Sequence, residues 1–398
     1  MRLRSQDGPP SRPRHHLSSS RPAGKLYAVT SPRTVSEIST PALVIDLAAM
    51  EANIRTMAEF FAEGSCRLRP HFKAHKTPEI ARRQLAGGSC VGLTCATVAE
   101  AEVISHFCGD ILIANEVVEP EKAARVAALA KRADIKVAVD SDAGLHQLAT
   151  AAQTAGVTIG VLVDVNVGMP RCGVAPGDAA VALARRIDGT PGLRLRGLMG
   201  YEGHAVGVPD RQTREAQTRA AMAVLTTTAL AVKAAGLACD IVSAGGTGTY
   251  DITGRVEGVT EVQAGSYVLM DTAYARLGLP FQQAFYILAT VLSRPTPTMC
   301  VADCGLKTAT EDHGNPAVAD PVGASVVFLS DEHATITVPS DSALQPGDRI
   351  RLWPSHIDPT INLHDALYVA DGERVVDVWP IAARGYAEER ADLAAVRP

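Results

Sequence analysis

Residues 134–167, "DIKVAVDSDAGLHQLATAAQTAGVTIGVLVDVNV", decide the fold. Two mostly apolar runs rich in β-branched residues, at 135–139 and 159–165, enclose a stretch whose apolar residues recur every three and four positions. The runs predict buried strands, and the stretch between them predicts an amphipathic helix that opens at Ser141. A strand, a helix and a second strand in this order favour a parallel sheet.

The same rhythm continues from about residue 67 to residue 270. Eight predicted strands lie at residues 66–73, 90–96, 110–117, 134–141, 158–167, 193–203, 239–248 and 260–270. Eight units in so short a stretch favour closure into a (β/α)8 barrel of the TIM type over an open doubly wound sheet. We assign residues 48–280 to this barrel.

The sequence pattern changes after residue 285. Alternating or β-branched segments separated by Pro, Gly and Asp turns lie at residues 284–295, 298–305, 324–339, 348–356 and 366–381. They predict a C-terminal all-β domain over residues 281–388. The short strand "PALVIDL" (41–47) lies outside the eight, so we expect residues 36–47 to join that β-domain and interlock the two domains.

The length and composition of the chain limit the classes of function that it can have. A chain of 398 residues fits one large domain and a smaller one. With 46% hydrophobic residues, 20% charged residues and a net charge of −5, it is typical of a soluble globular protein without a surface for nucleic acid. No apolar run approaches the roughly 18 residues of a membrane helix.

Two further features concern location. The eight cysteines contain no CxxC pair, which fits reduced thiols in a cytoplasmic protein. Residues 1–30, rich in Arg, Pro and Ser, lack the apolar stretch of a signal peptide, and we expect them to be a disordered extension.

Catalytic groups on a barrel of this kind lie at the C-terminal ends of its strands. The first strand ends in "LRPHFKAHKTPEI" (68–80), where Lys73 and Lys76 are candidates for covalent chemistry, with a solvated basic turn as the alternative. Arg171 follows the fifth strand, and Tyr201 and His204 end the sixth.

Glycines and hydroxyl side chains end the seventh and eighth strands. "SAGGTGTY" (243–250) contains Gly246 and Thr247, and "VQAGSY" (262–267) contains Gly265 and Ser266. Backbone N–H groups in such turns suit a phosphate, although two ordinary tight turns are the alternative. A lysine, a phosphate site, an arginine and an aromatic ring around one barrel mouth fit pyridoxal 5'-phosphate (PLP).

The last candidate site is "PSHIDPTINLHD" (354–365) in the β-domain. His356 and Asp358 are two residues apart, so on an extended chain they project to the same side and could hold a divalent metal. An imidazole and a carboxylate would suit Mn, Mg or Zn, whereas an ordinary turn is the alternative. His364 and Asp365 are further polar candidates.

Six of these motifs, in order, resemble the D-threonine aldolase and D-serine dehydratase group, PLP enzymes with the alanine-racemase-like barrel (PLP fold type III). They are "RPHFKAHK", "MPRCGV", "GGTGTY", "EVQAGSYVLMD", "SDEH" and "PSHIDPTINLHD", and the resemblance covers about residues 38 to 386. It implies that Lys73, and not Lys76, forms the Schiff base. The other implied cofactor contacts are Arg171 at the phenolic oxygen, Tyr201 against the pyridine face, Gln263 opposite the pyridine nitrogen, and Gly246, Thr247, Gly265 and Ser266 at the phosphate. The implied metal ligands are His356 and Asp358.

The metal pair also bears on the reaction. In this group His-x-Asp is typical of the aldolases and His-x-Cys of the dehydratases. We therefore expect an aldolase that cleaves a D-β-hydroxy-α-amino acid to glycine and an aldehyde. The alternatives are a D-serine or 3-hydroxyaspartate dehydratase, an amino-acid racemase that needs no metal, and a non-catalytic PLP-binding protein. The family also implies a homodimer in which the β-domain of one subunit closes the site of the other.

The sequence departs from the family at one position. The aldolases place a histidine six residues after the tyrosine of the sixth strand, and this chain has Gly207 there. Either His204, three residues after Tyr201, takes over a proton-transfer role, or the substrate differs from D-threonine. Glu202 is a second candidate base, with a surface carboxylate as its alternative interpretation.

Overall fold

The computed structural model describes residues 32–385. Within them one sheet is parallel and has the order β2-β9-β8-β7-β6-β5-β4-β3. Its strands are β2 (Arg67–Leu68), β3 (Leu93–Cys95), β4 (Asp110–Glu116), β5 (Asp134–Val139), β6 (Ile159–Asp164), β7 (Leu193–Gly200), β8 (Ile241–Ala244) and β9 (Glu261–Val262). Parallel bridges from Leu68 to Cys90 and from His71 to Thr94 join the two edges of the sheet. The predicted (β/α)8 barrel is confirmed.

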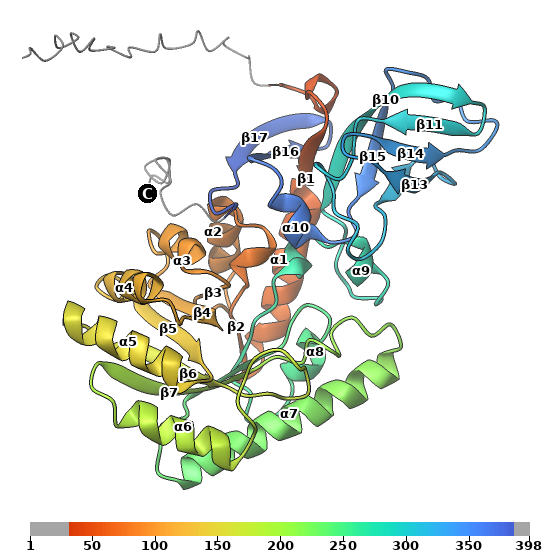
Figure 1. Ribbon diagram of the computed structural model, residues 1–398. Helices are drawn as coiled ribbons and strands as arrows, with labels where there is room; N and C mark the ends of the chain where they lie inside the picture. The colour runs from red at the N-terminus through yellow and green to blue at the C-terminus, as the bar shows by residue number, and fades with distance from the viewer. Residues whose placement is uncertain (1–31, 386–398) are drawn as a thin grey trace, which may run out of the picture. The chain divides into compact units, whose positions relative to one another are not determined.

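The α-helices of the described residues follow the predicted rhythm around the barrel, except the last, which lies in the β-domain. They are α1 (Leu47–Ala62), α2 (Pro78–Ala86), α3 (Val98–Ile104), α4 (Pro120–Leu129), α5 (Asp142–Ala155), α6 (Asp178–Asp188), α7 (Arg211–Ala234), α8 (Tyr250–Thr253), α9 (Thr272–Ala275) and α10 (Ile357–Ile361). Short 3-10 helices are η1 (Val35–Glu37), η2 (Phe72–Ala74) and η3 (Ser266–Val268). Figure 1 shows α3 to α7 on the outer side of the barrel strands.

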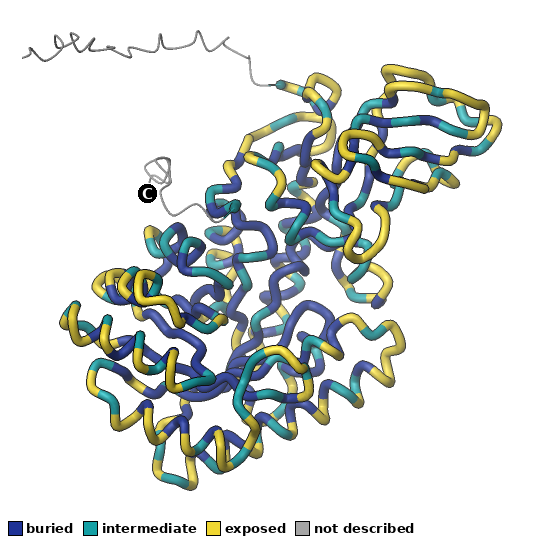
Figure 2. The backbone as a smooth tube through the Cα atoms, viewed as in Figure 1, coloured by how far each residue is buried: buried dark blue, intermediate teal, exposed yellow. Residues whose placement is uncertain are grey.

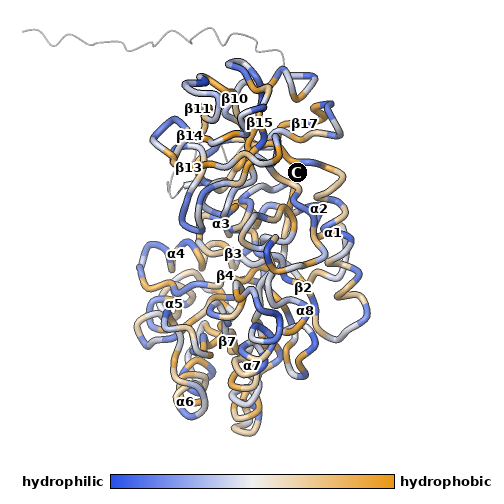
Figure 3. The backbone as a smooth tube through the Cα atoms, turned by 90° about the vertical axis from the view of Figure 1, so that its right-hand side faces the viewer, coloured by the Kyte–Doolittle hydropathy of each residue, from blue (hydrophilic) through white to orange (hydrophobic). Residues whose placement is uncertain are grey.

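Helix α5 illustrates how local sequence sets these elements. The side chain of Ser141 accepts a hydrogen bond from the backbone N–H of Gly144 and caps the helix, which ends at Gly156 with a φ of +67°. Leu148 and Ala152 are buried on its inner face. Figure 2 shows the same division throughout the barrel, with buried strands inside and exposed outer helix faces, and Figure 3 shows hydrophilic and hydrophobic stretches alternating along α4 and α5.

Paired charges lie at the N-terminal end of the barrel, opposite the end where catalysis is expected. Lys136 is fully buried, and its Nζ lies 2.9 Å from Oδ1 of Asp110 and 2.8 Å from Oδ2 of Asp134. The buried Arg69 pairs with Glu261 at 2.8 Å. Since these buried charges are all paired, they fit a structural role for this end of the barrel.

A mixed sheet forms the second part of the structure. Its strands are β1 (Ala42–Asp46), β10 (Phe285–Thr296), β11 (Met299–Ala302), β12 (Ala317–Asp320), β13 (Ser325–Leu329), β14 (Ala334–Thr337), β15 (Arg349–Trp353), β16 (Ala366–Asp371) and β17 (Arg374–Pro380). The order is β13-β14-β11-β10-β1-β16-β17, and β15 pairs with β10 and β12. Strand β1 thus runs between β10 and β16, antiparallel to the first and parallel to the second.

The β-domain differs in two details from its prediction. Strand β12 has only four residues, "AVAD", which is too short for a pattern. Helix α10 lies within the domain and contacts η2 of the barrel. The domain boundaries at 36–47, 48–280 and 281–388 stay predictions, and the predicted extension, residues 1–30, lies outside the described residues.

Two features noted in the sequence can be followed in the structure. All eight cysteines lie within residues 32–385, and each is an unpaired thiol there. In the same part of the chain, none of the helices has the length and apolar character needed to cross a membrane.

Candidate active site

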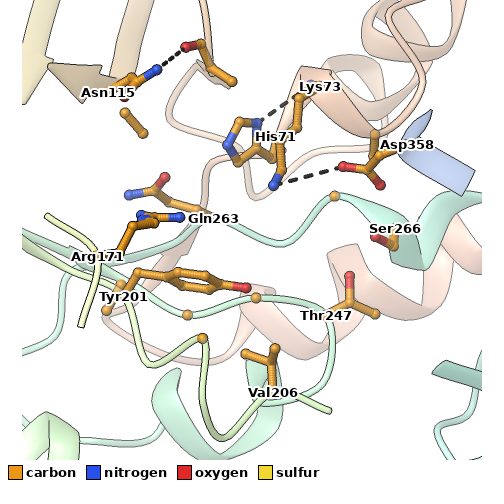
Figure 4. Close-up of a pocket in the computed structure, with 18 of the residues that line it drawn as sticks. His71, Lys73, Asn115, Arg171, Tyr201, Val206, Thr247, Gln263, Ser266 and Asp358 are labelled. Carbon is orange, nitrogen blue, oxygen red and sulfur yellow. Dashed lines mark hydrogen bonds and ion pairs between the residues drawn. The ribbon is translucent and has the colours of Figure 1, made fainter. Parts of the chain in front are cut away.

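A cavity of about 550 Å³ lies at the C-terminal ends of the barrel strands and is bordered by residues of the β-domain. The predicted site residues that line it are Lys73, Arg171, Tyr201, Gly246, Thr247, Gln263, Gly265, Ser266, His356 and Asp358. Segments far apart in the sequence therefore meet here. Figure 4 shows Arg171 and Gln263 at one side of the cavity, Thr247 and Ser266 at the other, and Lys73 pointing toward Asp358.

The two candidate lysines differ in their surroundings. Lys73 lies in η2 with its side chain 44% exposed, and its Nζ is 3.7 Å from Oδ1 of Asp358. Lys76 is buried, and its Nζ lies 3.0 Å from Oε1 of Glu100. The cavity lining therefore contains Lys73, whereas the charge of Lys76 is neutralised inside the protein.

His71 lies beside Lys73 in the cavity wall. Its Nδ1 accepts a hydrogen bond from the backbone N–H of Lys73 at 3.4 Å. Burial and then the charge of Lys73 lower the pKa of His71 well below its usual value. This imidazole is therefore neutral near pH 7, although the sequence assigned it no role.

An aromatic ring and a cation face the cavity together. The guanidinium carbon of Arg171 lies 5.4 Å from the centre of the Tyr201 ring. Burial and the nearby Glu202 raise the pKa of Tyr201 to about 12, so the ring is a neutral phenol. Gln263 donates from Nε2 to Oγ of Ser243 at 2.8 Å. A flat neutral ring bordered by a cation and an amide suits a planar heteroaromatic cofactor.

The side chain of Glu202 fixes the turn after β8 through hydrogen bonds. This side chain is fully buried and accepts hydrogen bonds from Gly245 N at 3.1 Å, Thr249 Oγ1 at 2.7 Å and Thr253 Oγ1 at 2.6 Å. Gly245 has a φ of +81°, which favours glycine. The interpretation of Glu202 as a surface carboxylate is wrong, and its contacts show a structural role in shaping the turn.

A second turn, after β9, packs against the first. The hydroxyl of Thr247 accepts a hydrogen bond from the backbone N–H of Tyr267 at 3.0 Å. A Cβ on Gly265 would lie 2.8 Å from the backbone oxygen of His71, so a side chain does not fit there. The two turns thus present glycine backbone and the hydroxyls of Thr247 and Ser266 to one region of the cavity, as an anion site requires.

The His-x-Asp pair has a different local structure from the one predicted. His356 is extended, but Asp358 lies in the first turn of α10, so the argument from an extended chain is wrong. Pro359 is compatible with this helix, because the first turn of a helix accepts a residue without an N–H. The pair still converges, with Nε2 of His356 3.7 Å from Oδ2 of Asp358.

The donor set of this pair fits a divalent metal. Oδ2 of Asp358 is buried and accepts no hydrogen bond within the described residues. A buried carboxylate oxygen without a partner is costly unless a cation compensates it. The imidazole and the carboxylate are also ligand types that Mn, Mg or Zn accept.

The sequence did not indicate a group of residues beside His356. Oδ2 of Asp312 lies 2.6 Å from Nδ1 of His356, and the ring of His313 stacks on that of His356 with 4.1 Å between centroids and 11° between planes. Burial raises the pKa of Asp312, but the hydrogen bonds from His356 and Thr310 outweigh it, so the pKa lies below its usual value. An acid and a histidine together in a polar turn, "EDHGN" (311–315), are the signal that could have found them.

A second group of possible ligands lies at other strand ends. Glu116, Asp140 and Cys172 bring ligand atoms within 4.8 Å of one another. Burial and then the charge of Glu116 raise the pKa of the Cys172 thiol. A protonated thiol is a poor ligand, so this group fits a metal less well than His356 and Asp358 do.

Three predicted candidates lie elsewhere. His204 is exposed, and a Cβ on Gly168 would lie 3.0 Å from its ring. Among the described residues that line the cavity, the histidines are His71, His313 and His356, so the geometry does not support proton transfer by His204. His364 donates a hydrogen bond from Nε2 to the backbone oxygen of Thr308 at 2.8 Å. Asp365 pairs with Arg384.

Comparison with known families defines the class of protein. The family described as "Alanine racemase, N-terminal domain" matches residues 45–290, and the "Putative serine dehydratase domain" matches residues 284–370. The barrel, with a lysine at the end of its first strand, is that of the alanine-racemase-like PLP enzymes.

Individual relatives narrow this class. The chain is 40% identical to a D-threonine aldolase from an Arthrobacter species over 359 residues, which cover 89% of this chain and 94% of the relative. It is 37% identical to a 3-hydroxy-D-aspartate aldolase from Paracoccus denitrificans over 361 residues, covering 88% and 93%. The crystal structure of the D-threonine aldolase from Filomicrobium marinum matches with a TM-score of 0.86 at 40% identity, covering 88% of this chain and 97% of that one. The chain belongs to the D-threonine aldolase and D-serine dehydratase family.

Proposed function

We propose that this protein is a PLP- and divalent-metal-dependent aldolase that cleaves D-β-hydroxy-α-amino acids to glycine and an aldehyde. The observation that carries the proposal is the distance of 3.7 Å between Nζ of Lys73 and Oδ1 of Asp358. It brings a lysine suited to hold PLP beside a carboxylate suited to hold a metal, in one cavity. The similarity to a D-threonine aldolase and a 3-hydroxy-D-aspartate aldolase supports the substrate class.

The barrel residues would bind and orient the cofactor. PLP supplies an electron sink for negative charge that develops at the substrate Cα. Lys73 would hold it, and the Tyr201 ring would lie against its pyridine face. Arg171 would contact the phenolic oxygen, and Gln263 would lie opposite the pyridine nitrogen. The two turns would hold the phosphate through Gly246, Thr247, Gly265 and Ser266.

The β-domain residues would determine which bond breaks. His356 and Asp358 would hold a divalent ion, Mn, Mg or Zn, which would supply positive charge to the β-hydroxyl of the substrate. With the hydroxyl anchored in this way, these two residues would orient the substrate's Cα–Cβ bond. The imidazole of His71 beside Lys73 is neutral, so it adds no positive charge to this part of the cavity.

Products distinguish the proposed reaction from its alternatives. We expect the PLP-loaded protein to convert D-threonine to glycine and acetaldehyde in the presence of Mn²⁺. The reaction should stop when the metal is chelated. The match of residues 284–370 to a serine dehydratase domain makes the dehydratase the second candidate. Appearance of 2-oxobutanoate and ammonia would establish that reaction instead, and metal-independent formation of L-amino acid would establish a racemase.

The Glu202 contacts give a prediction for cofactor binding. Glu202→Gln would place an amide N–H₂ against the donors Gly245 N, Thr249 Oγ1 and Thr253 Oγ1, so part of their hydrogen bonding is lost. At about 1–3 kcal/mol for a buried unsatisfied group, we expect PLP affinity to fall about tenfold or more. Titration of the apoprotein with PLP, followed by fluorescence quenching, measures this affinity.

A matched control separates the effect of the Glu202 contacts on the shape of the turn from the effect of losing one negative charge. Glu257→Gln removes an exposed carboxylate and should leave PLP affinity at the wild-type value. If Glu202→Gln and Glu257→Gln bind PLP equally well, Glu202 does not shape the phosphate turn.

Assembly and location complete the proposal. The family resemblance supports a homodimer in which the β-domain of one subunit closes the site of its partner. The eight unpaired thiols support a cytoplasmic location.

A further inference from the structure

Two carboxylates flank the imidazole of His356. Asp312, from the loop between β11 and β12, places Oδ2 2.6 Å from Nδ1 of the ring. The other ring nitrogen, Nε2, lies 3.7 Å from Oδ2 of Asp358. The first distance is that of a strong hydrogen bond and the second is too long for one. The two ring nitrogens therefore have different partners.

This difference determines where the ring carries its proton. An ionised carboxylate only accepts hydrogen bonds, so Asp312 requires a proton on Nδ1 of His356. In the neutral ring Nε2 then carries a lone pair, and it faces the buried Oδ2 of Asp358, which accepts no hydrogen bond among the described residues. Two lone pairs that face one another create a position for a cation.

His313 does not share that position. Its ring is nearly parallel to that of His356, with 4.1 Å between centroids. The lone pair of an imidazole lies in the plane of its ring, and a metal sits about 2.1 Å from the nitrogen in that plane. His313 thus packs against the ring of His356, although its ligand atom lies within 4.8 Å of those of Asp312 and His356. Nε2 of His356 and Oδ2 of Asp358 are the pair of atoms that would hold the ion.

We propose that Asp312 is the positioning residue of the metal site, which orients His356 so that Nε2 binds the divalent ion together with Asp358. The inference deepens the proposed function and depends on it for the metal. Carboxylates commonly orient metal-binding histidines in this way, and their loss lowers metal affinity by about 10- to 100-fold. Asp312 comes 44 residues before His356, so no local motif records the contact.

The test measures Mn²⁺ affinity in the PLP-loaded protein without substrate, from the electron paramagnetic resonance signal of free Mn²⁺. We expect Asp312→Ala to weaken Mn²⁺ binding by about 10- to 100-fold. Asp312→Asn should recover part of this loss, because its amide oxygen still accepts from Nδ1–H. Glu311→Gln removes an exposed charge from the same loop and should bind as the wild type does. The absorbance of the bound cofactor should be the same in all four proteins.

Three results would overturn the inference. Equal Mn²⁺ affinity in Asp312→Ala and Glu311→Gln would show that the contact with His356 does not matter for the metal. Complete loss of the bound ion in Asp312→Ala, as in Asp358→Ala, would make Asp312 a direct ligand. If the wild-type protein binds no Mn²⁺, the proposed metal-dependent function fails, and this inference fails with it.

Discussion

Replacing Lys73 by alanine is expected to lower turnover by at least about 10³-fold while the protein stays folded, because covalent catalysis loses its nucleophile. The side chain is 44% exposed in the cavity, so its removal leaves no tightly packed partner behind. The visible absorbance of the lysine-bound cofactor should disappear at the same time. Absorbance spectra after PLP loading and the rate of aldehyde release from D-threonine measure the two effects.

Lys76→Met is the matched variant, three residues along the same segment. The side chain of Lys76 is 9% exposed and that of its partner Glu100 is 1% exposed. Without the lysine, Glu100 is a buried charge deprived of an ion-pair partner, so we expect the free energy of unfolding to fall by about 3–5 kcal/mol. Denaturant unfolding measures this loss, and the folded fraction should keep the cofactor absorbance. The opposite pattern, in which Lys76→Met loses the absorbance and Lys73→Ala keeps it, would reverse the assignment.

Asp358→Ala is expected to remove the metal-dependent reaction, with a loss of at least about 10²-fold in turnover, since a bound metal contributes several kcal/mol to the stability of the transition state. The cofactor absorbance should persist because Lys73 is intact. Turnover of D-threonine across a range of Mn²⁺ concentrations gives the measurement. Wild-type turnover in the variant would show that Asp358 holds no metal that the reaction needs.

Asp365→Ala provides the control for that change. Asp365 belongs to the same sequence motif, but its side chain is 84% exposed and pairs with Arg384 at the surface. The Asp365→Ala variant should retain the activity of the wild-type protein and its response to added metal. A similar loss in both variants would point to general damage to this part of the β-domain.

The barrel could be predicted because its strands are buried on both faces. Runs such as 159–165 have no polar alternation, and the helices between them carry their own caps, so each unit is visible locally. The glycine turn after β8 is also visible in the local sequence. The choice between Lys73 and Lys76 was different, since both lie in the same short segment and only the family resemblance separated them. Their surroundings, an open cavity and a buried carboxylate, come from distant segments.

Three features of the site could not be predicted. His204 follows Tyr201 by three residues, but the turn carries it to Gly168 and out of the cavity lining. The burial of Glu202 depends on Thr249 and Thr253 from the next strand-helix unit. Asp312 reaches His356 because the pairing of β15 with β10 and β12 folds the two segments together. Each case depends on tertiary contacts that local patterns do not contain.

The position of β1 has a consequence for the order in which this protein folds. Residues 42–46 are made early, but their partners in β10 and β16 follow roughly 240 and 320 residues later. Pairings between such distant segments are slow to form, because a long loop must close first. The barrel with Lys73 can therefore assemble while β1 still lacks its neighbours. His356 and Asp358 come into place last, so we expect a growing or refolding chain to acquire affinity for the cofactor before it acquires affinity for the metal.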